Sequence, residues 1–209
     1  DRGADVRLGG YAQFVPFAAD ALLEVETDIA SGAIASLELA MCVQVTFDRL
    51  RERGAVDGRT VAVGGLGPAG LLAVQLARAW GADRVIAVDP VEDRRQRALA
   101  LGADAAVEPK DGALLEVVDG PVDTSVDCAG AKASVEFLMD HTQGAVALFG
   151  VLRDDVAYGW RHWRSHVDIV GYGRHNRDAA ERALALIEDG RLDLSAVVTH
   201  ELPLSRYAE

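Results

Sequence analysis

One loop of this chain carries glycines at the spacing G-x-G-x-x-G, and its residues are Gly65, Leu66, Gly67, Pro68, Ala69 and Gly70. The loop follows an apolar run of strand length, residues 60–64, and opens a segment of helical period, residues 68–80. In this context the first glycine permits a tight turn, the second lets backbone approach a pyrophosphate, and the third lets the helix pack against the strand. The helix N-terminus adds free N–H groups and the positive end of its dipole. The loop predicts a dinucleotide-binding site; the alternative is a glycine-rich turn without a ligand.

A carboxylate follows at the spacing expected of a group that binds the adenosine ribose. Asp89 lies 24 residues after Gly65, at the end of a predicted strand over residues 84–88. A carboxylate there accepts hydrogen bonds from the ribose 2′-OH and repels a 2′-phosphate, which favours NAD over NADP. The alternative is a helix cap, with Pro90 as the first helical residue, and the two roles are compatible.

Two arginines lie in the helix that is expected next, over residues 91–101. Arg94 lies one turn into this helix, where its side chain could cover the adenosine. Arg94 and Arg95 also keep NADP open as the cofactor, because an arginine at this place can bind a 2′-phosphate. The alternative for both is a solvated helix face.

The segments that must position these residues alternate between short apolar runs and longer stretches of helical period. This alternation is typical of βαβ units and a parallel sheet. Strands are expected at residues 60–64, 84–88, 105–107, 122–127, 144–151 and 167–171. Helices are expected at residues 37–53, 68–80, 91–101, 131–141 and 176–189. The pattern predicts an α/β fold of the Rossmann type, a doubly wound parallel sheet with its ligand at the carboxyl ends of the strands.

Composition argues against several other functions. The chain has 209 residues, with 21 Lys and Arg against 33 Asp and Glu, for a formal net charge of −12. This acidity argues against nucleic-acid binding, and the basic, aromatic residues 160–166 are interpreted as a surface segment.

No apolar run approaches the roughly 18 residues that a membrane span needs, and no signal segment is expected at the start of the sequence. The two cysteines, Cys42 and Cys128, suit a reducing compartment, so a cytoplasmic location is expected.

Further motifs occur in a fixed order along the chain. Residues 9–15 resemble a G-G-[YF]-A-E-[YF] strand, and residues 54–63 resemble an A-G-V-x-P-G-D-x-V-x-V approach to the glycine loop, one residue short. Residues 101–104 read L-G-A-D, and residues 189–204 contain D-G-R-L-D-L, V-T-H and L-P-L. In order and spacing, this set resembles the medium-chain dehydrogenase/reductase family, in particular its zinc-type alcohol and polyol dehydrogenases.

The resemblance implies a domain organisation. Residues 41–190 would be an NAD-binding Rossmann domain, with remnants of a GroES-like, β-rich catalytic domain at both ends. Residues 1–40 would be one remnant, and residues 191–209 would return toward that domain. The sequence itself predicts hairpin strands at residues 9–15 and 21–26, outside the α/β alternation. The sequence lacks the family's N-terminal part, with its Cys and G-H-E zinc ligands, and its last helix and strands. We therefore expect a chain that binds a dinucleotide without a complete active site.

The resemblance also implies a metal ligand and a catalytic residue. Cys42 and Thr46 have the C-x-x-x-T spacing of the family's central helix. If the one-residue shortening lies at Asp57, Cys42 is the third ligand of a catalytic zinc and Thr46 faces the nicotinamide. If it lies elsewhere, Met41 takes the ligand position and the metal site is broken. A buried, non-ligating cysteine is the alternative.

Turns after later strands complete the implied cofactor site. Cys128 and Ala129 would lie beside the adenine and phosphates, although core packing is the alternative for Cys128. Phe149, Gly150 and Val151 would line the nicotinamide pocket. Residues 171–173 would do the same after the next strand.

Three functions stay open at this point. The first is NAD-dependent, zinc-assisted hydride transfer between an alcohol or polyol and the matching carbonyl compound. The second is zinc-free reduction of enones or quinones with NADPH, and the third is a non-catalytic dinucleotide-binding fragment. The family's usual assembly implies a homodimer or homotetramer formed through edge strands, and no nucleic-acid or membrane partner is expected.

Overall fold

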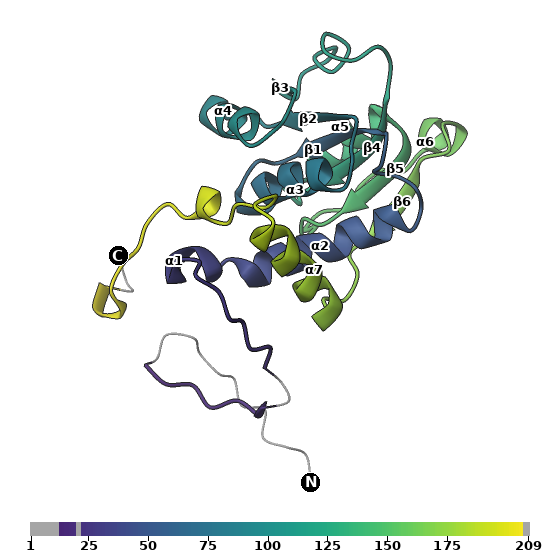
Figure 1. The fold of residues 1–209 in the computed structure, drawn as a ribbon. Helices are drawn as coiled ribbons and strands as arrows, with labels where there is room; N and C mark the ends of the chain where they lie inside the picture. Colours follow the sequence, from purple (N-terminus) through teal and green to yellow (C-terminus); the bar gives the residue numbers. More distant parts are fainter. Residues whose placement is uncertain (1–12, 20–21, 207–209) are drawn as a thin grey trace.

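The computed structural model describes residues 13–19 and 22–206 and contains one six-stranded parallel sheet of order β3-β2-β1-β4-β5-β6 (Figure 1). The strands are β1 (Thr60–Gly64), β2 (Arg84–Val88), β3 (Ala105–Val107), β4 (Val122–Asp127), β5 (Thr142–Leu148) and β6 (Asp168–Gly171). The chain runs outward from β1 to β3 and then returns to β4, on the other side of β1. Between β1 and β4 the winding direction reverses, which creates the crevice where such sheets bind ligands.

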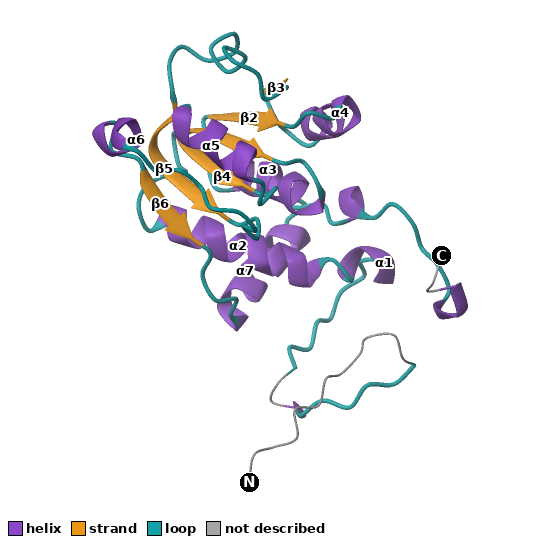
Figure 2. Ribbon diagram, turned by 180° about the vertical axis from the view of Figure 1, so that it is seen from behind, coloured by secondary structure: helices purple, strands orange, loops and turns teal. Residues whose placement is uncertain are grey.

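Helices cover both faces of the sheet (Figure 2). The helices are α1 (Ser31–Ile34), α2 (Leu37–Arg51), α3 (Pro68–Ala79), α4 (Glu92–Ala100), α5 (Lys132–Asp140), α6 (Trp160–Arg164) and α7 (Arg177–Glu188), with 3-10 turns η2 (Ser195–Val197) and η3 (Leu204–Arg206). Val61 and Val63 point into a core built with α2, α3, α4 and α7. Ala62 belongs to a second core, with residues of α5 and with Leu114. This alternation is the period of two of a buried strand.

The predicted sheet strands and the long helices are confirmed, with small shifts at their ends. The fifth strand was expected at residues 144–151 and forms over Thr142–Leu148, because residues 149–151 leave the sheet to line a pocket. The predicted hairpin is wrong where it can be checked. Residues 13–15 and 22–26 form no strand, since no neighbouring strand pairs with their backbone, and residues 9–12 and 21 lie outside the described residues.

Buried polar contacts fix helix α2 across α3 and α7. Gln44 is fully buried and accepts a hydrogen bond from Trp80 Nε1 at 3.0 Å, while its Nε2 donates to Asp48 at 2.7 Å. Asp48 in turn pairs with Arg182 of α7 at 2.7 Å, and the Arg51 guanidinium lies 3.5 Å from the Trp80 ring centre. These contacts orient α2, which carries Cys42 and Thr46.

The described residues before α1 and those after η2 extend away from the sheet in both views (Figures 1 and 2). Residues 22–30 have no regular structure, and η2 returns to contact α1 and α3. Gln75 of α3 holds the segment between α7 and η2 in place, because its side chain accepts a hydrogen bond from Asp193 N at 2.7 Å and donates one to Asp193 O at 3.2 Å. Among the described residues, no helix has the length and hydropathy needed to cross a membrane.

Candidate functional site

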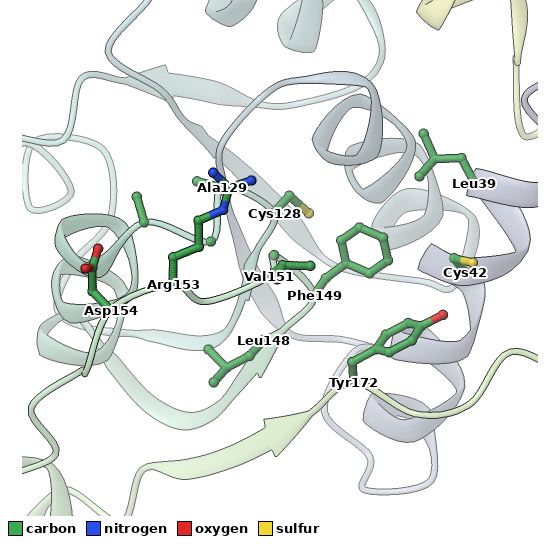
Figure 3. A pocket seen from close by; sticks show the side chains of 13 residues that line it. Leu39, Cys42, Cys128, Ala129, Leu148, Phe149, Val151, Arg153, Asp154 and Tyr172 are labelled. Carbon is green, nitrogen blue, oxygen red and sulfur yellow. The ribbon is translucent and has the colours of Figure 1, made fainter.

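Two pockets lie side by side at the carboxyl ends of the strands, at the reversal between β1 and β4. The larger pocket has a volume of about 790 Å³. It is lined by Leu39, Cys42, Cys128, Ala129, Gly130, Ala131, Leu148, Phe149, Gly150, Val151, Arg153, Asp154 and Tyr172 (Figure 3). The smaller pocket has a volume of about 520 Å³. Its lining residues are Gly65, Gly67, Val88, Asp89, Pro90, Arg94, Pro109, Cys128, Ala129, Ala131, Ala133, Ser134 and Phe137.

The glycine loop forms the floor of the smaller pocket. Gly65 has φ +82°, and a Cβ there would lie 2.7 Å from both the Cβ and the backbone N of Ala129. A Cβ at Gly70 would collide with the carbonyl oxygen of Gly65, so this position lets α3 approach the loop. Gly67 precedes the first residue of α3, Pro68, and a Cβ there would meet no atom within 4 Å. The loop therefore opens its middle glycine to a ligand at a helix N-terminus.

Asp89 is buried at the rim of the smaller pocket and is already hydrogen-bonded. Its Oδ2 accepts from Leu66 N at 2.7 Å and its Oδ1 from Val91 N at 2.8 Å. The carboxylate thus links β2 to the glycine loop and caps the chain just before α4. Pro90 is not the first helical residue, because α4 begins at Glu92.

The two arginines of α4 point to different places. Arg94 lines the smaller pocket and lies 3.7 Å from Asp89 Oδ2. Arg95 donates to Asp89 O at 2.6 Å and pairs with Glu92 on its own helix. Arg94 is thus the arginine available to a ligand in this pocket.

Cys128 and Ala129 line both pockets. Burial raises the pKa of the Cys128 thiol well above its ordinary value, and the charge of Asp127 raises it further. This thiol stays protonated at neutral pH and lines the site as a small apolar group.

Phe149, Gly150 and Val151 follow β5 and form one wall of the larger pocket. The Phe149 ring meets the Tyr172 ring edge to face, with centres 5.7 Å apart at 84°. In Figure 3 the Tyr172 hydroxyl points toward Cys42, and the two side chains lie at the same end of the pocket. The wall is therefore aromatic, with one polar group at its Cys42 end.

Cys42 lies in α2 at the edge of the larger pocket, and its Sγ donates to Glu38 Oε1 at 3.1 Å. Burial raises the pKa of the Cys42 thiol, and Glu38 adds to this effect, while the hydrogen bond with Tyr172 opposes it. Met41 does not line the pocket. Thr46, one turn further, is buried at 2 % exposure, lines neither pocket, and has an Oγ1 without a hydrogen-bond partner among the described residues.

A metal site is not complete within the described part of the chain. No group of three His, Cys, Asp or Glu residues there could hold an ion. The lining of the larger pocket includes the thiol of Cys128 and the carboxylate of Asp154. At the edge of this pocket the thiol of Cys42 lies beside the carboxylate of Glu38. Thiolate and carboxylate are both zinc ligands, so the chemistry of this pair suits zinc while the number of donors falls short of the three protein ligands of a catalytic site.

The structure brings together most, but not all, of the residues expected to bind a cofactor. Leu66, Pro68, Ala69 and Gly70 shape the loop without lining either pocket. Sequence reasoning missed other lining residues, among them Pro109, Ser134, Phe137 and Arg153. Ser134 and Phe137 are three residues apart in the helix after β4, and that spacing next to a strand end was the available signal.

Comparison with known proteins gives one consistent result. The family model for zinc-binding dehydrogenases matches residues 68–189. Rabbit (Oryctolagus cuniculus) alcohol dehydrogenase class-2 isozyme 2 is 31 % identical over 77 % of this chain and 46 % of its own length. L-threonine 3-dehydrogenase of Pyrococcus abyssi is 29 % identical over 71 % of this chain and 45 % of its own. The chain spans about half the length of these relatives.

Solved structures agree with this result. A structure described as a zinc-binding dehydrogenase from Sinorhizobium meliloti, bound to NADP, is 29 % identical, with a TM-score of 0.68, and the match covers 77 % of this chain and 49 % of that one. An alcohol dehydrogenase of Thermotoga maritima is 22 % identical, with a TM-score of 0.78, over 89 % of this chain and 55 % of that one, a likeness of fold.

Proposed function

This chain belongs to the zinc-binding dehydrogenases of the medium-chain dehydrogenase/reductase family, and from that premise we propose that it binds the dinucleotide of an NAD-dependent oxidoreductase. The reaction is hydride transfer between NAD(H) and an alcohol or polyol, or the matching carbonyl compound. The observation that carries the proposal is the glycine loop at the sheet reversal, opening onto two adjoining pockets.

The two pockets suit the two halves of a dinucleotide. The smaller pocket has Asp89 and Arg94 at its rim and the ring of Phe137 in its wall, which suits a ribose and a purine. The larger pocket offers aromatic walls and a polar end at Cys42 and Tyr172, which suits the nicotinamide and the reacting carbon. The pyrophosphate would lie between them at Gly67 and the N-terminus of α3.

Asp89 favours NAD, since its buried carboxylate repels a 2′-phosphate. NADP is the second candidate, because Arg94 faces the same pocket and the Sinorhizobium meliloti relative was solved with NADP. Titration of the chain with NADH and NADPH in parallel, followed by calorimetry, separates the two. Tighter NADH binding supports the proposal, tighter NADPH binding supports the second candidate, and binding of neither contradicts both.

Zinc would be held in part by Cys42, on the wall of the larger pocket. A bound zinc supplies a Lewis acid that stabilises the alcohol oxygen as an alkoxide. Residues outside the described part of the chain would have to supply the other ligands. If Cys42 binds the ion, zinc slows alkylation of Cys42 by iodoacetamide in the whole protein, which carries the other ligands, and does not slow alkylation of Cys128. Equal alkylation rates with and without zinc would instead favour the zinc-free reductases. If the whole protein oxidised no alcohol, the result would favour a non-catalytic dinucleotide-binding module.

We also propose self-association through β6, in a homodimer or homotetramer. β6 has one neighbouring strand in the described sheet, and Ile169 on it is 43 % exposed. Trp160 and Trp163 stack 4.9 Å apart on nearby α6 and are 69 % and 61 % exposed. An unpaired edge next to exposed aromatic rings is typical of an interface. The two free cysteines keep the cytoplasm as the proposed location.

Light scattering at tens of micromolar tests the assembly. Wild type should have at least twice the mass of one chain, and the double variant Trp160→Ala, Trp163→Ala should have a lower mass. A monomeric wild type would contradict the assembly and leave the dinucleotide site untouched.

A further inference from the structure

Residues 128–131, here called the ridge, lie between the two pockets. Cys128, Ala129 and Ala131 line both of them. A dinucleotide that occupies both pockets has to cross the ridge, so the position of the ridge sets the shape of the site. This inference rests on the proposed function and concerns the residue that holds the ridge in place.

The Asp127 carboxylate lies directly beneath the ridge. Asp127 ends β4 and is fully buried. Its Oδ2 accepts from Gly130 N at 2.8 Å, its Oδ1 accepts from Ser134 Oγ at 2.7 Å, and the N–H of Ala129 also bonds to the carboxylate. One side chain therefore ties together the ridge and the first turn of α5.

The backbone of Asp127 ties in a further segment. Its carbonyl oxygen accepts from Phe149 N and Gly150 N, both at 2.9 Å. Phe149 and Gly150 belong to the wall of the larger pocket. Asp127 thus joins the ridge to this wall through two sets of hydrogen bonds.

Close packing leaves the ridge little freedom to move. A Cβ at Gly150 would lie 2.7 Å from Asp127 Oδ2, and a Cβ at Gly130 would lie 2.5 Å from Val151 O. On the other side, Ala129 abuts Gly65 of the glycine loop. A shift of the ridge would therefore narrow one pocket and widen the other.

We propose that Asp127 is a positioning residue for the dinucleotide: its carboxylate holds the ridge at the place where both pockets keep their shape. Asp127 lines neither pocket, so it acts through Ala129 and Gly130 rather than by touching the cofactor. Loss of one acceptor oxygen leaves a buried N–H or O–H group without its partner, and the ridge moves to recover it.

A pH dependence accompanies this role. Burial raises the pKa of the Asp127 carboxyl above its ordinary value, against the lowering effect of its hydrogen bonds. Protonation removes an acceptor, so NADH affinity should fall as the pH falls toward that raised pKa. The other titratable or charged groups that face the ridge are Cys128 itself, Arg153 and Asp154 in the larger pocket, and Asp89 and Arg94 in the smaller one.

The test compares Asp127→Asn with Asp123→Asn, the same exchange at the opposite end of β4. Asp123 also accepts a backbone hydrogen bond, from Thr60 N at 2.9 Å, but it lies at neither pocket. NADH affinity is measured by calorimetry on each full chain from pH 7.5 to pH 5. Asp127→Asn should weaken NADH binding about tenfold at pH 7.5, the effect expected from losing one hydrogen bond to a buried acceptor oxygen. Asp123→Asn should weaken NADH binding less than twofold.

The pH profile separates positioning from general damage to the fold. Wild type and Asp123→Asn should both lose affinity on acidification, and Asp127→Asn should lose less, since its side chain does not titrate. If Asp127→Asn does not unfold cooperatively, Asp127→Ser replaces it, a smaller neutral side chain that still accepts a hydrogen bond. Equal affinities and equal profiles for wild type and Asp127→Asn would overturn the positioning role. An absence of NADH binding by wild type would instead overturn the proposed function on which it rests.

Discussion

Replacing Gly65 by alanine tests the close approach that shapes the floor of the smaller pocket. Two costs add at this position. The backbone has φ +82°, where a side chain costs about 1–2 kcal/mol. The new Cβ would also lie 2.7 Å from the Cβ and N of Ala129, and overpacking of this kind costs about 1–3 kcal/mol. We therefore expect Gly65→Ala to lower the free energy of unfolding by about 2–5 kcal/mol.

Gly112→Ala is the matched control. Gly112 has φ +80°, nearly the same as Gly65, but a Cβ there would meet no atom within 4 Å. It should lower the free energy of unfolding by the backbone cost alone, about 1–2 kcal/mol. Urea unfolding of both variants gives the difference, and calorimetry should show NADH affinity reduced at least tenfold for Gly65→Ala and unchanged for Gly112→Ala.

The reasoning is refuted if the two variants lose the same free energy of unfolding within about 0.5 kcal/mol, the scatter expected of independent sites. That result would mean that Ala129 moves aside at no cost. The double variant Gly65→Ala, Ala129→Gly offers a second check. It should recover only part of the loss, because the backbone N of Ala129 remains 2.7 Å from the new Cβ.

Three further variants test other parts of the structure. Asp89→Asn removes the charge that repels a 2′-phosphate, so the ratio of NADPH to NADH affinity should rise about tenfold in parallel titrations; an unchanged ratio would exclude Asp89 from ribose recognition. Trp80→Phe removes the hydrogen bond to buried Gln44 and should lower the free energy of unfolding by about 1–2 kcal/mol in urea; no loss would show that α2 does not need this link. In the variant Cys42→Ser, burial keeps the pKa of the Cys128 thiol raised, so alkylation of Cys128 should be slow at pH 8 and faster only at higher pH. At that higher pH, bound NADH should slow the alkylation of Cys128. Rapid alkylation at pH 8 would contradict that burial.

The sheet and its long helices could be predicted because most strands are short, largely apolar runs and the helices between them carry apolar residues at helical spacing. The glycine loop and Asp89 were predictable for the same reason, since their spacing fixes them at the ends of neighbouring strands. The hairpin at residues 9–15 and 21–26 was predicted from short local stretches that do not fit the α/β alternation. Strand formation needs a partner for the backbone, and residues 13–15 and 22–26 have none in the sheet.

Contacts between distant segments could not be predicted. The place of Asp127 beneath the ridge depends on how β4 meets β1 and β5, and residue spacing does not give this arrangement. The same holds for Asp89, whose link to Leu66 needs two strands in register. Spacing identifies the residue type at a strand end, but only the assembled sheet shows which N–H group that residue bonds.

Asp89 combines a proposed role in cofactor recognition with two backbone hydrogen bonds, and this combination limits how cofactor preference can change during evolution. The carboxylate that would select the ribose also holds Leu66 N of the glycine loop and Val91 N ahead of α4. An exchange of Asp89 for a residue without a side-chain acceptor removes both supports at once and loosens the glycine loop at the smaller pocket. Lineages that changed preference from this starting point would therefore first acquire a second donor or acceptor for Leu66 or Val91. Stabilising substitutions around residues 89–94 would precede the change in specificity, so the order of mutations is constrained by two hydrogen bonds.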